Sequence, residues 1–304
     1  MMAHVLKTLA VTAGLLISGA AFAQTADPAT PPPPAPPAAG PVAPVAAEWR
    51  TVAAEDLLVV DTTKGRVFVE LAPRIAPLHV ERIRLLAHAG FYDNLVWHRV
   101  IDGFMAQTGD PLGTGDGQSP YPDLKAEFTF RRGPDMVFTP VSVPAGAALG
   151  FIGSLPVQTQ PDAVMATTAD GKVHGWGVYC PGVAGMARDE GNDTANSQFF
   201  LMRQPYPSLD KRYTVWGNVV AGLDVVRALK VGDGDNGIVT AEPDRMIRVR
   251  VASDLPQGER PMVQVLDTMS DRFRAMLAQE REARGADFSV CDIILPSQVS
   301  GAPG

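Results

Sequence analysis

The alternation of apolar and polar residues becomes regular from Asp56 onward. Residues 57–60 and 67–71 are mostly apolar, and the polar stretch 62–65 between them ends in glycine. Short apolar runs joined by a Gly-containing link are typical of a β-hairpin. We therefore expect two paired strands where the folded part of the chain begins.

A helical pattern follows the hairpin. Between Pro77 and Ala89, apolar side chains recur at the three-and-four spacing that places them on one helix face. Proline suits the first turn of a helix, and glycine, here Gly90, suits the position just past its end. The pattern predicts a helix over residues 77–89, and a second, short helix is expected over 223–229.

The remaining chain up to about residue 252 consists of short β-type runs separated by glycine and proline turns. Residues 213–220 and 246–251 are examples. Many short strands with only two helices favour a mainly β protein, and we expect a closed antiparallel β-barrel.

Residues 1–23 have the layout of a secretory signal peptide. Lys7 supplies a positive charge, residues 9–17 an apolar stretch, and residues 21–23 a small-x-small cleavage site. An uncleaved membrane anchor is the alternative, but the apolar stretch is shorter than the ~20 residues that span a bilayer. We expect export, to the periplasm or as a secreted protein.

Residues 24–55 are expected to form a linker. Between residues 28 and 44 the chain is almost only Pro, Ala, Gly and Val, a composition that cannot build a packed core. Such a segment is an extended tether. A ligand for a proline-binding module is the alternative interpretation.

Charge and composition exclude several classes of function. The net charge of −7 comes without a long basic run, which argues against nucleic acid and against an anionic membrane surface as partners. No segment after the signal peptide is apolar enough to span a membrane. Two cysteines and five histidines show no metal-ligand spacing, so we expect no metal and no other cofactor.

Two ordered stretches carry the strongest signal. Residues 91–111 read FYDNLVWHRVIDGFMAQTGDP, and residues 185–202 read GMARDEGNDTANSQFFLM. Together they resemble the two halves of a cyclophilin active site, with Met-Ala-Arg as in bacterial cyclophilins. The resemblance covers residues 56–252. It implies that family's closed eight-stranded antiparallel β-barrel capped by two helices, and its activity, peptidyl-prolyl cis-trans isomerisation.

Cis-trans isomerisation is a rotation about the X-Pro peptide bond of the substrate, and its catalysis requires neither a nucleophile nor a metal. The X-Pro amide is resonance-stabilised, so the barrier to this rotation is about 20 kcal/mol. A catalyst needs a dry surface for the proline ring and a donor that stabilises the twisted amide, whose nitrogen regains its lone pair. Arg99 fits the donor because a guanidinium stays charged and presents several N–H groups. A surface ion pair is the alternative for an isolated arginine.

The resemblance implies roles for further residues. Phe104 and Gln107 join Arg99 as catalytic residues. The residues expected to bind the substrate are Met105, Ala187, Arg188, Gln198, Phe200, Leu209 and Tyr213. Phe199 should alternate to the opposite side of its strand from Phe200 and is expected in the core.

Two features lie within the domain but depart from the minimal family pattern. Ser208 stands where many members carry an aromatic residue, which removes one rim of the pocket. An insertion at about residues 131–180 places Asp170-Gly171 between two short runs, 164–167 and 173–176. That turn signal predicts an added β-hairpin.

A C-terminal extension, residues 253–304, follows the domain. Its apolar residues between 266 and 277 recur at helical spacing and predict an amphipathic helix, and the apolar run 293–295 should pack on something. In an oxidising compartment Cys180 and Cys291 can form a disulfide that joins the insertion to the extension. Two buried free thiols are the alternative.

The leading hypothesis is a peptidyl-prolyl cis-trans isomerase that assists folding of exported proteins, with proline-containing unfolded or exported polypeptides as partners. A non-catalytic chaperone that binds proline segments is the alternative. A third interpretation makes the two additions an envelope scaffold or an interface with a second copy. The sequence leaves the oligomeric state open.

Overall fold

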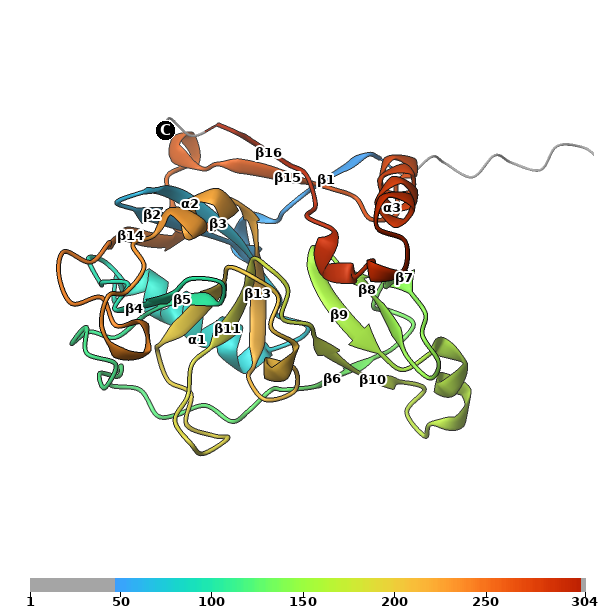
Figure 1. Ribbon diagram of the computed structural model, residues 1–304, viewed down its shortest axis with the longest axis horizontal. Helices are drawn as coiled ribbons and strands as arrows, with labels where there is room; N and C mark the ends of the chain where they lie inside the picture. Colours follow the sequence, from blue (N-terminus) through green and yellow to red (C-terminus); the bar gives the residue numbers. More distant parts are fainter. Residues whose placement is uncertain (1–46, 302–304) are drawn as a thin grey trace, which may run out of the picture. The chain divides into compact units, whose positions relative to one another are not determined.

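The computed structural model describes residues 47–301 (Figure 1). The expected signal peptide, and residues 24–46 of the expected linker, lie outside the described residues. Within residues 47–301, no helix is both long enough and apolar enough to cross a membrane.

An eight-stranded antiparallel sheet forms the centre of the domain, in the order β14-β2-β3-β13-β11-β12-β5-β4. Its opening hairpin and the two helices that accompany it, α1 (Pro77–His88) and α2 (Leu223–Ala228), were predicted from the sequence and are confirmed. The strands are β2 (Leu57–Thr62), β3 (Gly65–Leu71), β4 (Arg99–Ile101), β5 (Met105–Thr108), β11 (Val183–Met186), β12 (Phe199–Met202), β13 (Val215–Ala221) and β14 (Met246–Val251).

The prediction of a closed barrel is wrong, because β14 and β4 stand at opposite ends of the sheet and do not pair with each other. An irregular segment covers the β14 edge instead. The Asn94 N–H donates to the Met246 carbonyl (2.7 Å), and the Met246 N–H donates to the Leu95 carbonyl (2.8 Å). Since these contacts satisfy the edge's backbone groups, the sheet curls without having to close.

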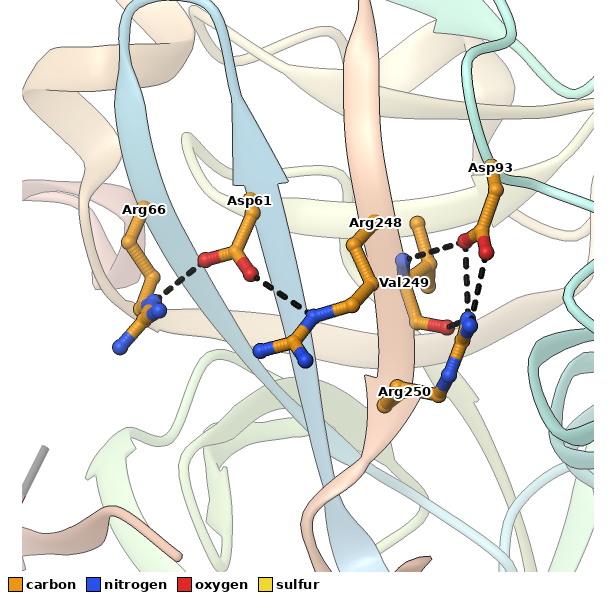
Figure 2. A network of polar contacts seen from close by, with 6 residues as sticks. All are labelled: Asp61, Arg66, Asp93, Arg248, Val249 and Arg250. Carbon is orange, nitrogen blue, oxygen red and sulfur yellow. Dashed lines mark hydrogen bonds and ion pairs between the residues drawn. The ribbon is translucent and has the colours of Figure 1, made fainter. Parts of the chain in front are cut away.

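The carboxylates of Asp61 and Asp93 hold this covered edge through contacts with arginines (Figure 2). Asp61 on β2 lies between Arg66 on β3 (2.5 Å) and Arg248 on β14 (3.4 Å). Asp93, in the covering segment, accepts both Nη groups of Arg250 (2.8 and 2.7 Å). It also accepts the backbone N–H of β14 at Val249 (3.0 Å). The two clusters tie β14 to the sheet on one side and to the covering segment on the other.

The first hydrophobic core lies between this sheet and helix α1. Phe199 belongs to it and is buried, as predicted, while its neighbour Phe200 belongs to a second core. The Phe199 ring makes edge-on contacts with Tyr92, Trp97 and Trp216. The alternation of side chains along β12 therefore separates the two cores.

The insertion is larger than the predicted hairpin. Five antiparallel strands form a sheet in the order β6-β10-β9-β8-β7. The first arm of the expected hairpin is a 3-10 helix, Asp162–Thr167, and β10 pairs with β9 and β6 rather than with that neighbouring segment. The strands are β6 (Phe130–Arg132), β7 (Thr139–Ser142), β8 (Ala148–Ile152), β9 (Leu155–Thr159) and β10 (Val173–Gly177).

The C-terminal extension forms a further sheet and a helix, which begins later than the predicted pattern because Leu266 lies in a strand. Helix α3 (Asp271–Arg284) begins at Ser270, whose hydroxyl accepts the Phe273 N–H (3.1 Å). Strands β15 (Met262–Leu266) and β16 (Ser297–Ser300) pair with each other, and β15 also pairs with β1 (Trp49–Thr51). The folded part therefore begins before Asp56, within the stretch expected to be linker.

We call β1, β6–β10 and the chain after β14 the accessory region. Its insertion strands and α3 lie together beside the eight-stranded sheet (Figure 1). A second hydrophobic core contains residues of the sheet and of the accessory region. Phe151 meets Phe273 edge-on within this core, and Ile293 is buried in it. A disulfide joins Cys180 to Cys291, with 4.8 Å between the Cα atoms.

Candidate active site

Arg99 lies on β4 directly opposite Gln107 on β5. Residues paired in register across antiparallel strands project to the same face. The Arg99 Nη1 accordingly donates to the Gln107 side-chain oxygen at 3.1 Å. Local strand pairing therefore sets the first contact of the guanidinium.

A relay of neutral amides supports Gln107. Its Nε2 donates to the Gln198 side-chain oxygen (2.9 Å), and the Gln198 amide donates to the carbonyls of Gly115 (2.7 Å) and Gly117 (2.9 Å). The relay places Arg99, Gln107 and Gln198 in one connected network anchored on a loop.

Asp110 holds that loop in shape. Its carboxylate accepts the backbone N–H groups of Leu112 (2.7 Å), Thr114 (2.8 Å) and Gly115 (2.5 Å). Burial alone would raise the pKa of Asp110, but these donors outweigh it and lower the pKa below its ordinary value. Gly117 is required, because a Cβ there would meet the Asp110 Oδ1 at 1.8 Å.

A cavity of about 320 Å³ opens beside Arg99 and brings together nine of the ten predicted catalytic and substrate-binding residues. Gln198 is the exception, and it lines a smaller adjoining cavity of about 70 Å³ that shares Gln107, Ala187 and Arg188. The larger cavity is lined by Arg99, Phe104, Met105, Gln107, Ala187, Arg188, Phe200, Leu209, Tyr213 and Asn236.

The floor of the larger cavity is apolar. Met105 and Phe200 are almost fully buried and belong to the second core, while Phe104 is only partly buried. Tyr179 stacks behind Phe200 with 5.8 Å between ring centroids. Near Ser208, the Tyr206 ring contacts Phe104 at a tilt of 44°, with 4.4 Å between the ring centroids.

Among the described residues, two arginines and no acidic residue line the larger cavity. Burial lowers the pKa of Arg99, whose ordinary value is far enough above neutral for it to remain a cation. The Arg188 guanidinium lies over the Tyr213 ring (4.6 Å) and donates to three backbone carbonyls. His98, the neighbour of Arg99, is buried and does not line the cavity.

Sequence reasoning missed Asn236. It reaches the site from a loop 137 positions away from Arg99 in the sequence. It lies outside both motif stretches. The Asn236-Gly237 pair indicates a turn, but nothing in the sequence indicates that the turn contacts Arg99. Only the tertiary fold identifies this residue.

Comparison with known proteins agrees with this geometry. The sequence model of the family described as cyclophilin type peptidyl-prolyl cis-trans isomerase/CLD matches residues 57–251. A probable peptidyl-prolyl cis-trans isomerase of Brucella suis is 32% identical over 212 residues, which is 66% of this chain and 84% of the relative. A peptidyl-prolyl cis-trans isomerase-like 1 of Aspergillus oryzae is 29% identical over 194 residues, 64% of this chain and 94% of the relative.

A solved structure extends the likeness. Cyclophilin AquaCyp293 from Hirschia baltica matches with a TM-score of 0.76 and 34% identity, over 84% of this chain and 95% of that one. Because 84% of this chain is a longer stretch than residues 57–251, the likeness to the solved structure extends beyond those residues into the accessory region. The chain belongs to the cyclophilin family and is a peptidyl-prolyl cis-trans isomerase of that type.

Proposed function

We propose that Arg99 catalyses the isomerisation by stabilising the twisted X-Pro amide of a substrate held in the larger cavity. The observation that carries the proposal is the donor pattern of its guanidinium. Three of its five N–H groups are used, by Gln107 and Asn236. One N–H on each of Nη1 and Nη2 has no acceptor among residues 47–301, and both are free to meet the prolyl nitrogen and the neighbouring carbonyl.

The apolar floor supports the same proposal. A proline ring on Met105 and Phe200, flanked by Phe104 and Leu209, removes apolar surface from water, at about 25 cal/mol per Å² buried. Exclusion of water strengthens the electrostatic interaction between the Arg99 guanidinium and the amide. The backbone of Ala187 and the side chains of Gln107, Gln198, Arg188 and Tyr213 then orient the peptide around that ring.

We further propose that the substrates are exported polypeptides. The N-terminal pattern of a signal peptide supports export to the periplasm or secretion. The Cys180–Cys291 disulfide agrees with an oxidising compartment. Fractionation of cells expressing the full chain tests this, since accumulation in the cytoplasm of a chain that retains residues 1–23 would contradict it.

A coupled isomerase assay on a proline-containing tetrapeptide tests the mechanism. Arg99→Ala should lower kcat/KM by about 100-fold or more, the typical loss for one preorganised donor to a developing charge. Arg99→Lys keeps the charge but loses the planar fork, so it should remain well below wild type. Thermal unfolding of each variant controls for folding. A wild-type rate for Arg99→Ala would overturn the proposed mechanism.

A further inference from the structure

We propose that Asn236 is a positioning residue for Arg99. This inference rests on the proposed role of Arg99. The Arg99 Nε donates to the Asn236 backbone carbonyl and the Arg99 Nη2 donates to the Asn236 side-chain oxygen, both at 2.9 Å. One residue therefore holds one edge of the guanidinium by two hydrogen bonds, and Gln107 holds Nη1.

Asn236 is itself held in an uncommon backbone conformation. Its φ of 54° lies in the left-handed region, which asparagine tolerates better than most residues. In this conformation the carbonyl and the side-chain oxygen of the same residue both reach Arg99. A residue without a side-chain oxygen would keep only the first contact.

The loop that carries Asn236 is tied to the strand that carries Arg99. The Gly232 N–H donates to the Val100 carbonyl, and the Val239 N–H donates to the His98 carbonyl, both at 2.9 Å. These contacts flank Arg99 on either side along β4. The acceptor therefore moves with the strand, so the guanidinium keeps one orientation without any contact from the substrate.

Every acceptor on Arg99 is neutral. Gln107 and Asn236 provide amide and carbonyl oxygens, and Arg99 has no ion-pair partner among residues 47–301. The clamp thus fixes the direction of the guanidinium and leaves its charge for the substrate. A surface ion pair, the alternative for an isolated arginine, is not formed with any residue that the structure describes.

Asn236→Gly tests the inference, because glycine keeps the left-handed backbone and its carbonyl and removes only the side-chain oxygen. Loss of a hydrogen bond to a charged group should lower kcat by about tenfold, with KM for the tetrapeptide changed by less than about twofold. Asn94→Gly is the matched control: Asn94 is also left-handed (φ 63°), is exposed, and lies outside the site. It should leave kcat at the wild-type value.

Arg99→Lys supplies the second half of the test. Since lysine has no fork for Asn236 to hold, Asn236→Gly should cause no further loss in that background. An equal loss in both backgrounds, or a wild-type kcat for Asn236→Gly, would overturn the positioning role. If Arg99→Ala lowers activity and Asn236→Gly does not, only this inference fails. If Arg99→Ala has no effect, the proposed mechanism fails as well.

If Asn236→Gly proves unstable, the NMR signal of the Arg99 Nε–H provides a separate readout in Asn236→Asp, which retains both oxygens. That N–H should stay as protected from exchange with water as in the wild type. Rapid exchange in the wild type would show that the clamp is not held and would overturn the inference.

Discussion

The eight-stranded sheet and the accessory region contribute to the larger cavity in different ways. Every residue that lines the cavity comes from the sheet and its loops, and none comes from β1, β6–β10 or the chain after β14. Yet the cavity floor, Met105 and Phe200, belongs to a core that continues to Phe151 and Phe273 in the accessory region. The lining of the cavity is thus local to the sheet and its loops, while the support of the floor is shared.

The contacts around Arg99 differ in kind from the contacts that join the two regions. Around Arg99 they are directional hydrogen bonds between neutral groups, each sensitive to a few tenths of an ångström. Between the regions, apolar packing in the second core tolerates small shifts and supplies stability, alongside an ion pair between Arg50 on β1 and Glu70 on β3 (2.6 Å). The disulfide joins the insertion to the extension within the accessory region. Changes in the accessory region should therefore affect unfolding first, and changes in the relay should affect turnover first.

The largest effect on stability is expected from the disulfide. It closes a loop of 111 residues, so its loss in Cys180→Ser/Cys291→Ser should lower the free energy of unfolding by about 5 kcal/mol in the chain-entropy model. Urea unfolding measures this, and the protein that stays folded should keep its kcat. A reducing agent should destabilise the wild type and leave the double variant unchanged. Equal stability of the two proteins would mean that the disulfide adds nothing to the other contacts that join the insertion to the extension.

A somewhat smaller loss is expected from the shared core. Phe273 is fully buried, and Phe273→Ala should lower the free energy of unfolding by about 3–5 kcal/mol through lost burial and a residual cavity. Phe288→Ala, at a partly buried ring on the margin of the same core, is the graded control and should cost less. If both substitutions cost the same small amount, the accessory region does not share a core with the cavity floor.

The relay should respond in the opposite way, with turnover more sensitive than stability. Gln107→Leu removes a bond to the Arg99 cation and should lower kcat by about 10- to 100-fold, whereas Gln198→Leu removes bonds between neutral groups and should cost about three- to tenfold. The tetrapeptide assay measures both. Equal losses would show that the relay does not act through Arg99.

The sheet was largely predictable from the sequence because its signals are local. The hairpin at 57–71 and helix α1 follow from residue patterns within a few positions, and Phe199 and Phe200 separate by simple alternation along one strand. The two motif stretches contain most of the residues around the cavity, and the family pattern already encodes their meeting in space.

The rest could not be predicted because it depends on pairings between distant segments. Strand β10 pairs with β9 and β6, so the Asp170-Gly171 turn gives no hairpin. The barrel stays open because the segment at Asn94 satisfies the β14 edge. Asn236 reaches Arg99 only through the fold. In each case the partner lies far away in the sequence, and the first arm of the predicted hairpin is a 3-10 helix rather than a strand.

The smallest effect concerns Asp210, which lies where the two regions meet. Burial raises its pKa to about 6, although the Tyr179 N–H, donated at 3.0 Å, and Lys211 both act to lower it. Because the folded pKa exceeds the unfolded one near 3.8, the stability that Asp210 contributes is fully present below about pH 4 and is lost as pH rises through about 6.

Asp210→Asn keeps an oxygen for the Tyr179 N–H and removes the charge, so it should be more stable than the wild type at pH 7.5 by about 1 kcal/mol, and no more stable at pH 4. Urea unfolding across that range measures the difference, with the exposed Asp287→Asn as a control that should show no such trend. Asp210 follows the cavity residue Leu209 but does not itself line the cavity, so KM should change by less than about twofold. A difference in stability that is the same at both pH values would show that the Asp210 carboxylate is not penalised by burial between the two regions.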